Sequence, residues 1–304
     1  CMKCTKQLFK MLYGRNGMKN KNEILSLLQQ QSHDSANLLY YSSVLTEFNK
    51  AMSNPDVQVD QLSNIIEKDP GLTASVLKMA NSSFYGLSKR VATVKHAVSL
   101  LGYRALEKIF TVNLLNKALN KQKTVHGENL WKHSLATAIA AQQIIGITQP
   151  KYVEQIFTAG LLHDIGKFFI MNFLPEEFDM LMKEFTKNPY QYSLPLDNKC
   201  IGLDHQQIGA FFAELWMFPE TVVYSIKYHH SIDNAPAYKD VVAAISIGNN
   251  IAKGMELGQS TSMLVELAPR WVWNYLGIKR NDFSNLIPVI QQKYNAYLAF
   301  LNIM

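Results

Sequence analysis

The sequence of 304 residues lacks the hallmarks of several protein classes. Its three cysteines, Cys1, Cys4 and Cys200, are too few and odd in number for a disulfide framework, so the expected compartment is a reducing cytoplasm. With 10 prolines, 15 glycines, 48% hydrophobic and 18% charged residues, the composition excludes collagen-like and disordered chains. Because no apolar run approaches the roughly 18 residues of a membrane-spanning helix, we expect a soluble globular protein.

Acidic residues are absent from residues 1–22, an arm that carries six lysine and arginine residues. The rest of the chain balances 24 basic against 24 acidic side chains, so its body is neutral and no nucleic-acid partner is expected. The arm has no continuous apolar stretch of the kind found in secretory signal peptides. We interpret it as a solvated tail, with binding to an acidic membrane surface as the alternative.

The apolar pattern predicts an all-α fold. Apolar residues recur with a period near 3.6 from about residue 23 onward, while β-type alternation is nearly absent. The segment 69–72 (Asp-Pro-Gly-Leu) predicts a helix start, because aspartate is a good cap and proline suits the first helical position. Gly102 is typical of a left-handed helix end, so one helix should end there and another should cover 103–120.

Further helices and one internal boundary follow from the same pattern. Polar and charged residues at 121–128 predict a boundary near residue 124 between two helical lobes. We therefore expect a basic arm (1–22), a first lobe (23–124) and a second lobe with a helical C-terminal extension (125–304). The remaining helices are predicted over 36–52, 129–145, 151–172, 203–216, 220–230, 240–253 and 263–302.

Histidines beside small residues mark a candidate site in the second lobe. His133 shares a helix face with Ala136 and Ala140, along which another helix could approach closely. His163 is followed by Asp164, and this pair offers a nitrogen and an anionic oxygen, both good ligands for divalent first-row ions. On the predicted 151–172 helix, glycines flank the pair on both sides, which indicates that something needs the space.

Two more helices carry histidines in similar settings. His205 begins a helix with Gly209 one turn later, and His229 and His230 end another helix. Adjacent helical residues point about 100° apart, so both of the latter could reach one cluster only from the helix end. A lone histidine on an apolar face is usually a hydrogen-bonded core residue. Taken together, however, these histidines support two interpretations equally well: a shared polar or metal centre, and separate hydrogen-bonded core residues.

These motifs resemble a known superfamily, the HD metal-dependent phosphohydrolases. The resemblance rests on residues 131–135 (WKHSL), 160–167 (GLLHDIGK), 204–209 (DHQQIG) and His229-His230. In the first lobe, residues 69–72 (DPGL), 79–86 (MANSSFYG) and 94–102 (VKHAVSLLG) resemble the HDOD family, the HD-related output domains of bacterial signalling. The similarity covers roughly residues 35–255.

The resemblance implies a metal-ligand set. The matching positions are His133, His163, Asp164, His205, His229, His230 and Asn249. At the last position HD hydrolases have an aspartate, and the neutral asparagine should weaken a dication site and leave bound water less acidified. The implied cofactors are one or two divalent transition-metal ions (Fe, Mn, Zn or Ni), or none. If the site is active, Asp164 and Lys167 are the implied catalytic residues; alternatively, Lys167 is a solvated residue at a helix end.

The family resemblance implies a signalling output domain that acts through protein contacts in a bacterial cytoplasm, with little or no catalysis. The missing aspartate and the neutral body favour this hypothesis. The alternative is a metal-dependent phosphohydrolase or phosphodiesterase acting on a nucleotide or cyclic dinucleotide. The absence of Gly-Tyr-Pro after residues 163–167 counts against the cyclic-di-GMP phosphodiesterase subfamily. A third hypothesis is a nucleotide sensor without turnover. The expected partners are therefore signalling proteins, or a nucleotide ligand.

Overall fold

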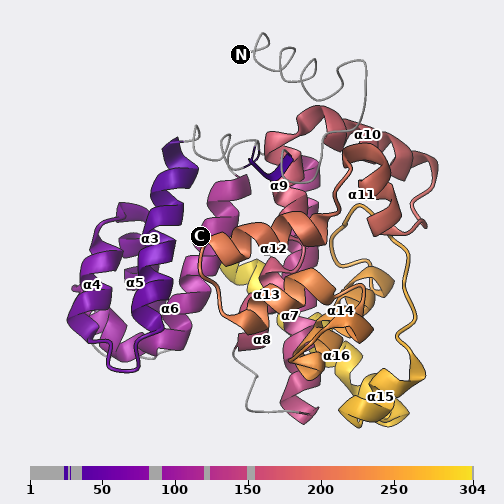
Figure 1. Cartoon of the computed structure of the whole chain (residues 1–304). Helices are drawn as coiled ribbons and strands as arrows, with labels where there is room; N and C mark the ends of the chain where they lie inside the picture. Colours follow the sequence, from indigo (N-terminus) through magenta and orange to yellow (C-terminus); the bar gives the residue numbers. More distant parts are fainter. Residues whose placement is uncertain are drawn as a thin grey trace.

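The structure is a computed structural model of the chain, and it describes residues 24–26, 28, 36–81, 91–119, 124–148 and 155–302. Within these ranges the chain forms helices, turns and irregular segments but no strand, which confirms the all-α fold (Figure 1). No helix in the described part of the chain is both long enough and apolar enough to cross a membrane. The arm 1–22, with Cys1 and Cys4, lies outside the described residues.

Four helices form the first half of the fold. They are α3 (Ala36–Met52), α4 (Val59–Glu67), α5 (Pro70–Ala80) and α6 (Val94–Leu119), and the first three pack against α6 (Figure 1). Helix α3 has the predicted bounds. Helix α6 is broken at Gly102, whose φ of 72° lies in the left-handed region, so the predicted helix end is present as a kink within a longer helix.

The capping residues fold α5 as its sequence predicts. The Oδ1 atom of Asp69 accepts a hydrogen bond from the backbone N–H of Leu72 at 2.9 Å, and Pro70 is the first helical residue. After the helix, Asn81 exchanges two hydrogen bonds of 2.8 Å with the backbone of Val91. The side chain of Asn81 therefore ties the end of α5 to the segment that leads into α6.

The second half is built around α7 (Val125–Thr148), which contacts α8, α14 and α16. The other helices are α8 (Gln155–Leu162), α9 (Ile165–Phe173), α10 (Pro175–Lys187), α11 (Ser193–Ile201), α12 (His205–Leu215), α13 (Glu220–Tyr228), the 3-10 helix η3 (Ile232–Asn234), α14 (Lys239–Gly254), α15 (Arg270–Leu276) and α16 (Arg280–Asn302). The first half docks onto this group through α6, which contacts α7, α8 and α9. The lobe boundary near residue 124 stays a prediction.

Two helix predictions for the second half were wrong, and two helices were not predicted. The predicted helix 151–172 is two helices, α8 and α9, separated by a turn at residues 163–164. Residues 263–269 are not helical, so the C-terminal helices begin only at Arg270. Helices α10 and α11 were not predicted, although α10 begins with proline followed by two glutamates, which are ordinary start signals.

Candidate metal centre

The His163-Asp164 pair forms the turn between α8 and α9. The Nδ1 atom of His163 lies 2.8 Å from the carbonyl oxygen of Gly160, one turn back on α8, which directs Nε2 away from the helix. Asp164 is the N-cap residue of α9, but its carboxylate makes no capping bond to that helix. Both side chains are therefore free to face the same interior space.

Glycines allow neighbouring helices to approach this turn. A Cβ atom on Gly160 would lie 2.4 Å from the Cα atom of Ala138 in α7, and one on Gly166 would lie 1.9 Å from the carbonyl oxygen of His205 in α12. Neither distance is possible for a side chain, so only glycine permits these contacts. The small-residue stripe predicted on the His133 face of α7 has the same role, because Gly248 of α14 packs against the backbone of Thr137.

Asp164 lies at the centre of four histidines. Its Oδ2 atom is 3.8 Å from Nε2 of His133 and 3.5 Å from Nε2 of His163, while its Oδ1 atom is 3.2 Å from Nε2 of His205 and 3.7 Å from Nε2 of His229. These five side chains come from α7, the His-Asp turn, α12 and the end of α13. All of them are at most 1% exposed. The fold thus brings histidines distant in sequence onto one buried carboxylate.

Hydrogen bonds to the outer ring nitrogens orient His205 and His229. The Nδ1 atom of His205 lies 2.5 Å from Oδ2 of Asp197, and Nδ1 of His229 lies 2.9 Å from the carbonyl oxygen of Ile226. In each ring the Nε2 atom is left to face Asp164. Burial acts to lower the pKa of His205, but the two carboxylates that contact it outweigh burial and raise that pKa above its usual value.

His230 and Asn249 border the same cluster. The ring centroid of His230 is 4.4 Å from that of His229 and 5.3 Å from that of His205, because these adjacent residues follow the last turn of α13. Asn249 is a buried residue of α14, and its side chain interacts with that of His133. All seven predicted ligand positions therefore lie in or beside one buried cluster. Within it, two groups of three residues each have candidate ligand atoms that lie within 4.8 Å of one another: His133-His163-Asp164 and His205-His229-His230.

Charge states in the His133-His163-Asp164 group suit metal binding. Burial lowers the pKa of His133 to about 3 and holds that of His163 well below its usual value, so both rings are neutral at pH 7. Burial acts to raise the pKa of Asp164, but the Lys167 ammonium and the neighbouring histidines outweigh it and hold that pKa well below its usual range. Neutral imidazoles and an ionised carboxylate are the forms that bind metal ions.

Several buried nitrogen and oxygen atoms in the cluster have no hydrogen-bond partner. They are Nε2 of His133, Nε2 of His163, Oδ1 of Asp164, Nε2 of His230 and Oδ1 of Asn249. Buried polar atoms are nearly always paired, so a concentration of unpaired ones at a single place needs an explanation. Imidazole nitrogens and carboxylate oxygens are the donors that divalent first-row transition metals prefer. The residues present therefore fit such an ion.

Lys167 is buried inside the centre, so its interpretation as a solvated residue was wrong. Its Nζ atom donates to Oδ2 of Asp164 at 2.9 Å and to Oγ of Ser260 at 2.7 Å, and the Ser260 hydroxyl donates to the same Asp164 oxygen at 2.9 Å. Lys167 is 1% exposed and Ser260 is 4% exposed. Aspartate, lysine and serine thus form a closed triangle of hydrogen bonds.

A segment without helix, residues 255–269, covers the centre, and we call it the strap. Gly258 adopts a φ of 76° and packs so closely that an added Cβ would lie 2.2 Å from the backbone nitrogen of His133. The backbone N–H of Gln259 donates to the carbonyl oxygen of Asn129, and Met263 donates likewise to Pro189. Sequence reasoning missed Ser260 and also Asp197, because neither belongs to a motif or an apolar pattern.

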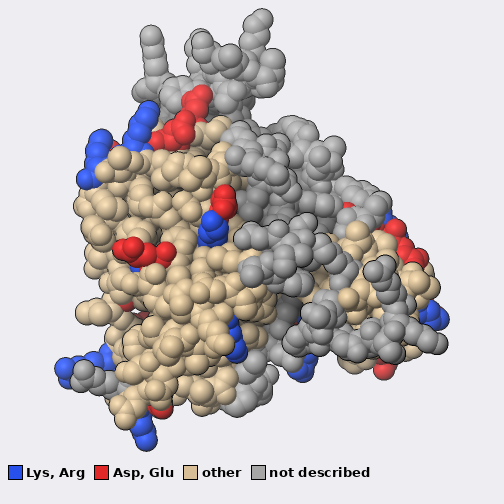
Figure 2. Space-filling view, turned by 180° about the vertical axis from the view of Figure 1, so that it is seen from behind, with Lys and Arg blue, Asp and Glu red and all other residues tan. Residues whose placement is uncertain are grey.

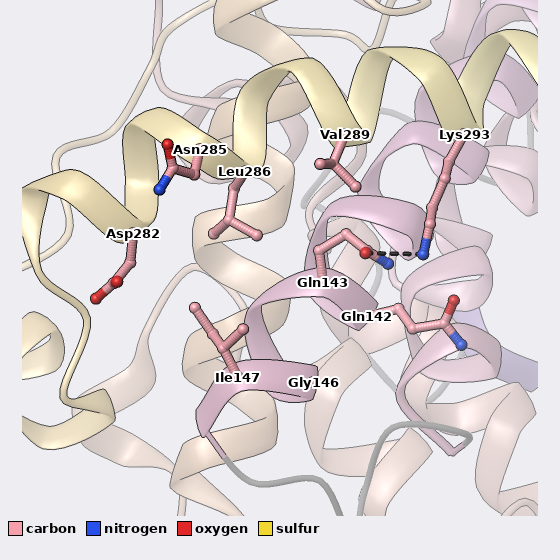
Figure 3. Close-up of a pocket in the computed structure, with 9 residues that line it drawn as sticks. All are labelled: Gln142, Gln143, Gly146, Ile147, Asp282, Asn285, Leu286, Val289 and Lys293. Atoms are coloured by element: carbon pink, nitrogen blue, oxygen red, sulfur yellow. Dashed lines mark hydrogen bonds between the residues drawn. The ribbon is translucent and has the colours of Figure 1, made fainter.

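An open groove lies elsewhere on the surface, between α7 and α16 (Figure 3). Its walls combine apolar side chains such as Leu286 and Val289 with polar ones, and Lys293 donates a hydrogen bond of 2.8 Å to Oε1 of Gln143 across it. None of the predicted site residues lines this groove. The histidine centre is instead enclosed by the helices and the strap.

Residues 38–232 match the family model of the HDOD domain, which is well over half of the chain. The chain belongs to the HDOD family. An uncharacterized protein of Treponema pallidum (strain Nichols) is 29% identical over 212 residues, which are 68% of this chain and 40% of that protein. The chain thus spans less than half the length of this relative.

Solved structures share the HDOD fold. A protein from Marinobacter aquaeolei VT8, provisionally named a signal transduction protein, has a TM-score of 0.73 and 20% identity, covering 98% of this chain and 64% of the other. An HDOD domain protein of unknown function from Geobacter sulfurreducens has a TM-score of 0.62 and 22% identity, covering 92% and 96%. A protein from Shewanella amazonensis SB2B, provisionally named a phosphohydrolase, has a TM-score of 0.60 and 21% identity, covering 85% and 94%.

Proposed function

We propose that this HDOD protein is a regulatory output domain of the bacterial cytoplasm, which relays a signal through protein contacts and has little or no catalytic activity. In this proposal the buried cluster holds one or two divalent transition-metal ions that stabilise the signalling conformation. The metal ligands are His133, His163, Asp164, His205, His229, His230 and Asn249. The observation that carries the proposal is the enclosure of the centre.

Enclosure argues against turnover because a hydrolase must admit its substrate. The four histidines around Asp164 and Asp164 itself are at most 1% exposed, the side chains of Asn249 and His230 are nearly buried, and Ser260 of the strap is hydrogen-bonded to Asp164. Lys167, which the family resemblance would place on a substrate phosphate, is already bonded to Asp164 and Ser260. A phosphoester could approach the centre only after these contacts had been broken.

Asn249 supports the same proposal. A metal ion, when bound, would acidify a water molecule and draw a phosphate oxygen towards its charge. Each carboxylate ligand in such a site adds negative charge and strengthens binding of a dication. Asn249, which is 3% exposed, offers only a neutral oxygen without a hydrogen-bond partner at the position where HD hydrolases have an aspartate. A site with this neutral ligand should hold an ion less tightly than an HD hydrolase does and acidify its water less, which favours little or no hydrolysis.

The surface is compatible with protein partners. Figure 2 shows one face on which lysines, arginines, aspartates and glutamates of the described residues are scattered over uncharged surface, without a continuous basic stripe. Nucleic-acid binding normally uses such a stripe. The name of the Marinobacter relative, which refers to signal transduction, agrees with a role exerted through other proteins.

The alternative function is a metal-dependent phosphohydrolase acting on a nucleotide or cyclic dinucleotide. The nearly complete histidine set favours it, as does Lys167, which could release Asp164 and hold a substrate phosphate. In that case Asp164 and Lys167 are the catalytic residues. A nucleotide sensor that binds the same ligand without turnover is a third candidate.

Elemental analysis and a phosphoester assay separate these functions. We expect the purified protein to contain a stoichiometric transition metal and to hydrolyse generic phosphoesters at a rate near the blank. His163→Ala should lose the metal, whereas His96→Ala, which alters an exposed histidine of α6, should retain it. Robust hydrolysis that His163→Ala abolishes and His96→Ala preserves would select the phosphohydrolase. A metal-free wild-type protein would refute the metal centre.

A further inference from the structure

We propose that Glu266 is a positioning residue of this centre: it holds the ring of His230 so that Nε2 faces the cluster. The proposal rests on the metal centre proposed above. Glu266 belongs to the strap and lies beyond residues 38–232, the part matched by the HDOD family model. Neither the family motifs nor the apolar pattern identifies it.

The contact between Glu266 and His230 carries the inference. The Oε1 atom of Glu266 lies at an ion-pair distance of 3.1 Å from Nδ1 of His230, and both this oxygen and Nε2 of His230 are buried without a hydrogen-bond partner. The two nitrogens point in different directions from the imidazole ring, so holding Nδ1 fixes the direction of Nε2. On the neighbouring ligand His205, a carboxylate contacts the same ring nitrogen, and there Oδ2 of Asp197 forms a full hydrogen bond with Nδ1.

Two side chains of α14 hold this part of the strap. Asn250 donates from Nδ2 to the carbonyl oxygen of Glu266 at 2.6 Å, and its Oδ1 atom accepts from the backbone N–H of Glu266 at 2.9 Å. Lys253 donates to the carbonyl oxygen of Leu264 at 3.2 Å, and its Nζ atom lies 4.0 Å from Oε1 of Glu266. The carboxylate is therefore fixed by its backbone and by a neighbouring cation.

Glu266 also supplies negative charge beside His230, in a centre that lacks the family aspartate. The residue before Asn250 is Asn249, the neutral residue at the position of the family aspartate. Helix α14 therefore lacks a carboxylate at Asn249, and through Asn250 it holds the backbone of Glu266, which carries one. A carboxylate that accepts a hydrogen bond from a metal-binding histidine fixes the ring tautomer and makes the other nitrogen a stronger ligand. Glu266 would strengthen binding at His230 in this way without contacting the ion.

Metal affinity tests this role. Mn²⁺ and Zn²⁺ are titrated separately against a competing chelator, using wild-type protein, Glu266→Ala and Glu266→Gln. We expect the dissociation constant to rise about 10–100-fold in Glu266→Ala, and by less in Glu266→Gln, which retains an acceptor oxygen. The matched control is Glu256→Ala, because Glu256 is an exposed residue of the same strap. Wild-type affinity in Glu266→Ala would overturn the inference and leave the metal centre standing, whereas wild-type protein that binds neither ion would overturn both.

Nitrogen chemical shifts of the histidines give a second readout that needs no variant and no metal. In metal-free wild-type protein we expect the His230 ring to carry its proton on Nδ1, donated to Glu266. A proton on Nε2 would overturn the proposal, even if Glu266→Ala failed to fold. In a folded Glu266→Ala protein the preference for Nδ1 should disappear, while the shifts of His205 should stay unchanged.

Discussion

Replacing Gly166 with alanine should separate α9 from α12 and displace His205. The added Cβ would lie 1.9 Å from the carbonyl oxygen of His205 and 2.8 Å from its carbonyl carbon. Both atoms are backbone, so no side-chain rotation relieves the clash, and the oxygen must retreat by about 1.1 Å to reach 3.0 Å. Overpacking of a core usually costs about 1–3 kcal/mol, and a rigid backbone contact belongs at the upper end.

A loss of about 3 kcal/mol corresponds to a melting temperature lower by roughly 6–12 °C for a protein of this size. Thermal unfolding followed by circular dichroism measures this change. The matched control is Gly254→Ala at the end of α14, where the nearest atom to an added Cβ is a methyl group of Val265 at 3.8 Å. That variant should be neutral or more stable by up to about 1 kcal/mol. Equal melting temperatures for the two variants would refute the close approach of α9 and α12.

Two further predictions concern charges at the centre. Asn249→Asp places a carboxylate beside His133, so the variant should bind Mn²⁺ or Zn²⁺ at least about tenfold more tightly; a chelator competition that gives wild-type affinity would contradict this. Burial lowers the pKa of Lys253 to about 8, so the unfolded chain binds a proton that the folded chain lacks between pH 8 and about 10.5. Lys253 therefore destabilises the folded chain least above pH 10.5, where it is neutral in both states, and the stability gained there is lost as the pH falls to 8. Between pH 8 and 9.5 the free energy of unfolding should rise by roughly 1–2 kcal/mol more in the wild type than in Lys253→Met, and equal slopes in urea titrations would count against it.

The sequence predicted the features that depend on local pattern. Capping by Asp69 and the left-handed conformation of Gly102 are properties of a few adjacent residues, so they could be inferred without tertiary contacts. The helical period located α3 and α14 nearly to the residue. The family motifs singled out histidines that the fold gathers around Asp164, because a motif records which residues matter even when their spatial arrangement is unknown.

Features that depend on tertiary packing were missed or misplaced. The two-residue turn at His163 lies within an apolar run, and the helical period continues across it without a visible interruption. Helix α11 is short and polar and contains Pro195, so its pattern is weak. Asp197, Ser260 and Glu266 reach the centre from segments with no motif of their own. Their roles follow only from which side chains they contact in the folded chain.

In the proposed metal centre, the strap should also control how fast a bound ion is released. It is anchored by backbone hydrogen bonds from Gln259 and Met263 and by the hydroxyl of Ser260. An ion enclosed beneath these bonds could leave only when several of them open together, so its release would be limited by local unfolding of the strap and would be slow even where its affinity is moderate. The metal content of such a protein would then reflect the ions available when it folded, and would follow later changes in their concentration only with delay.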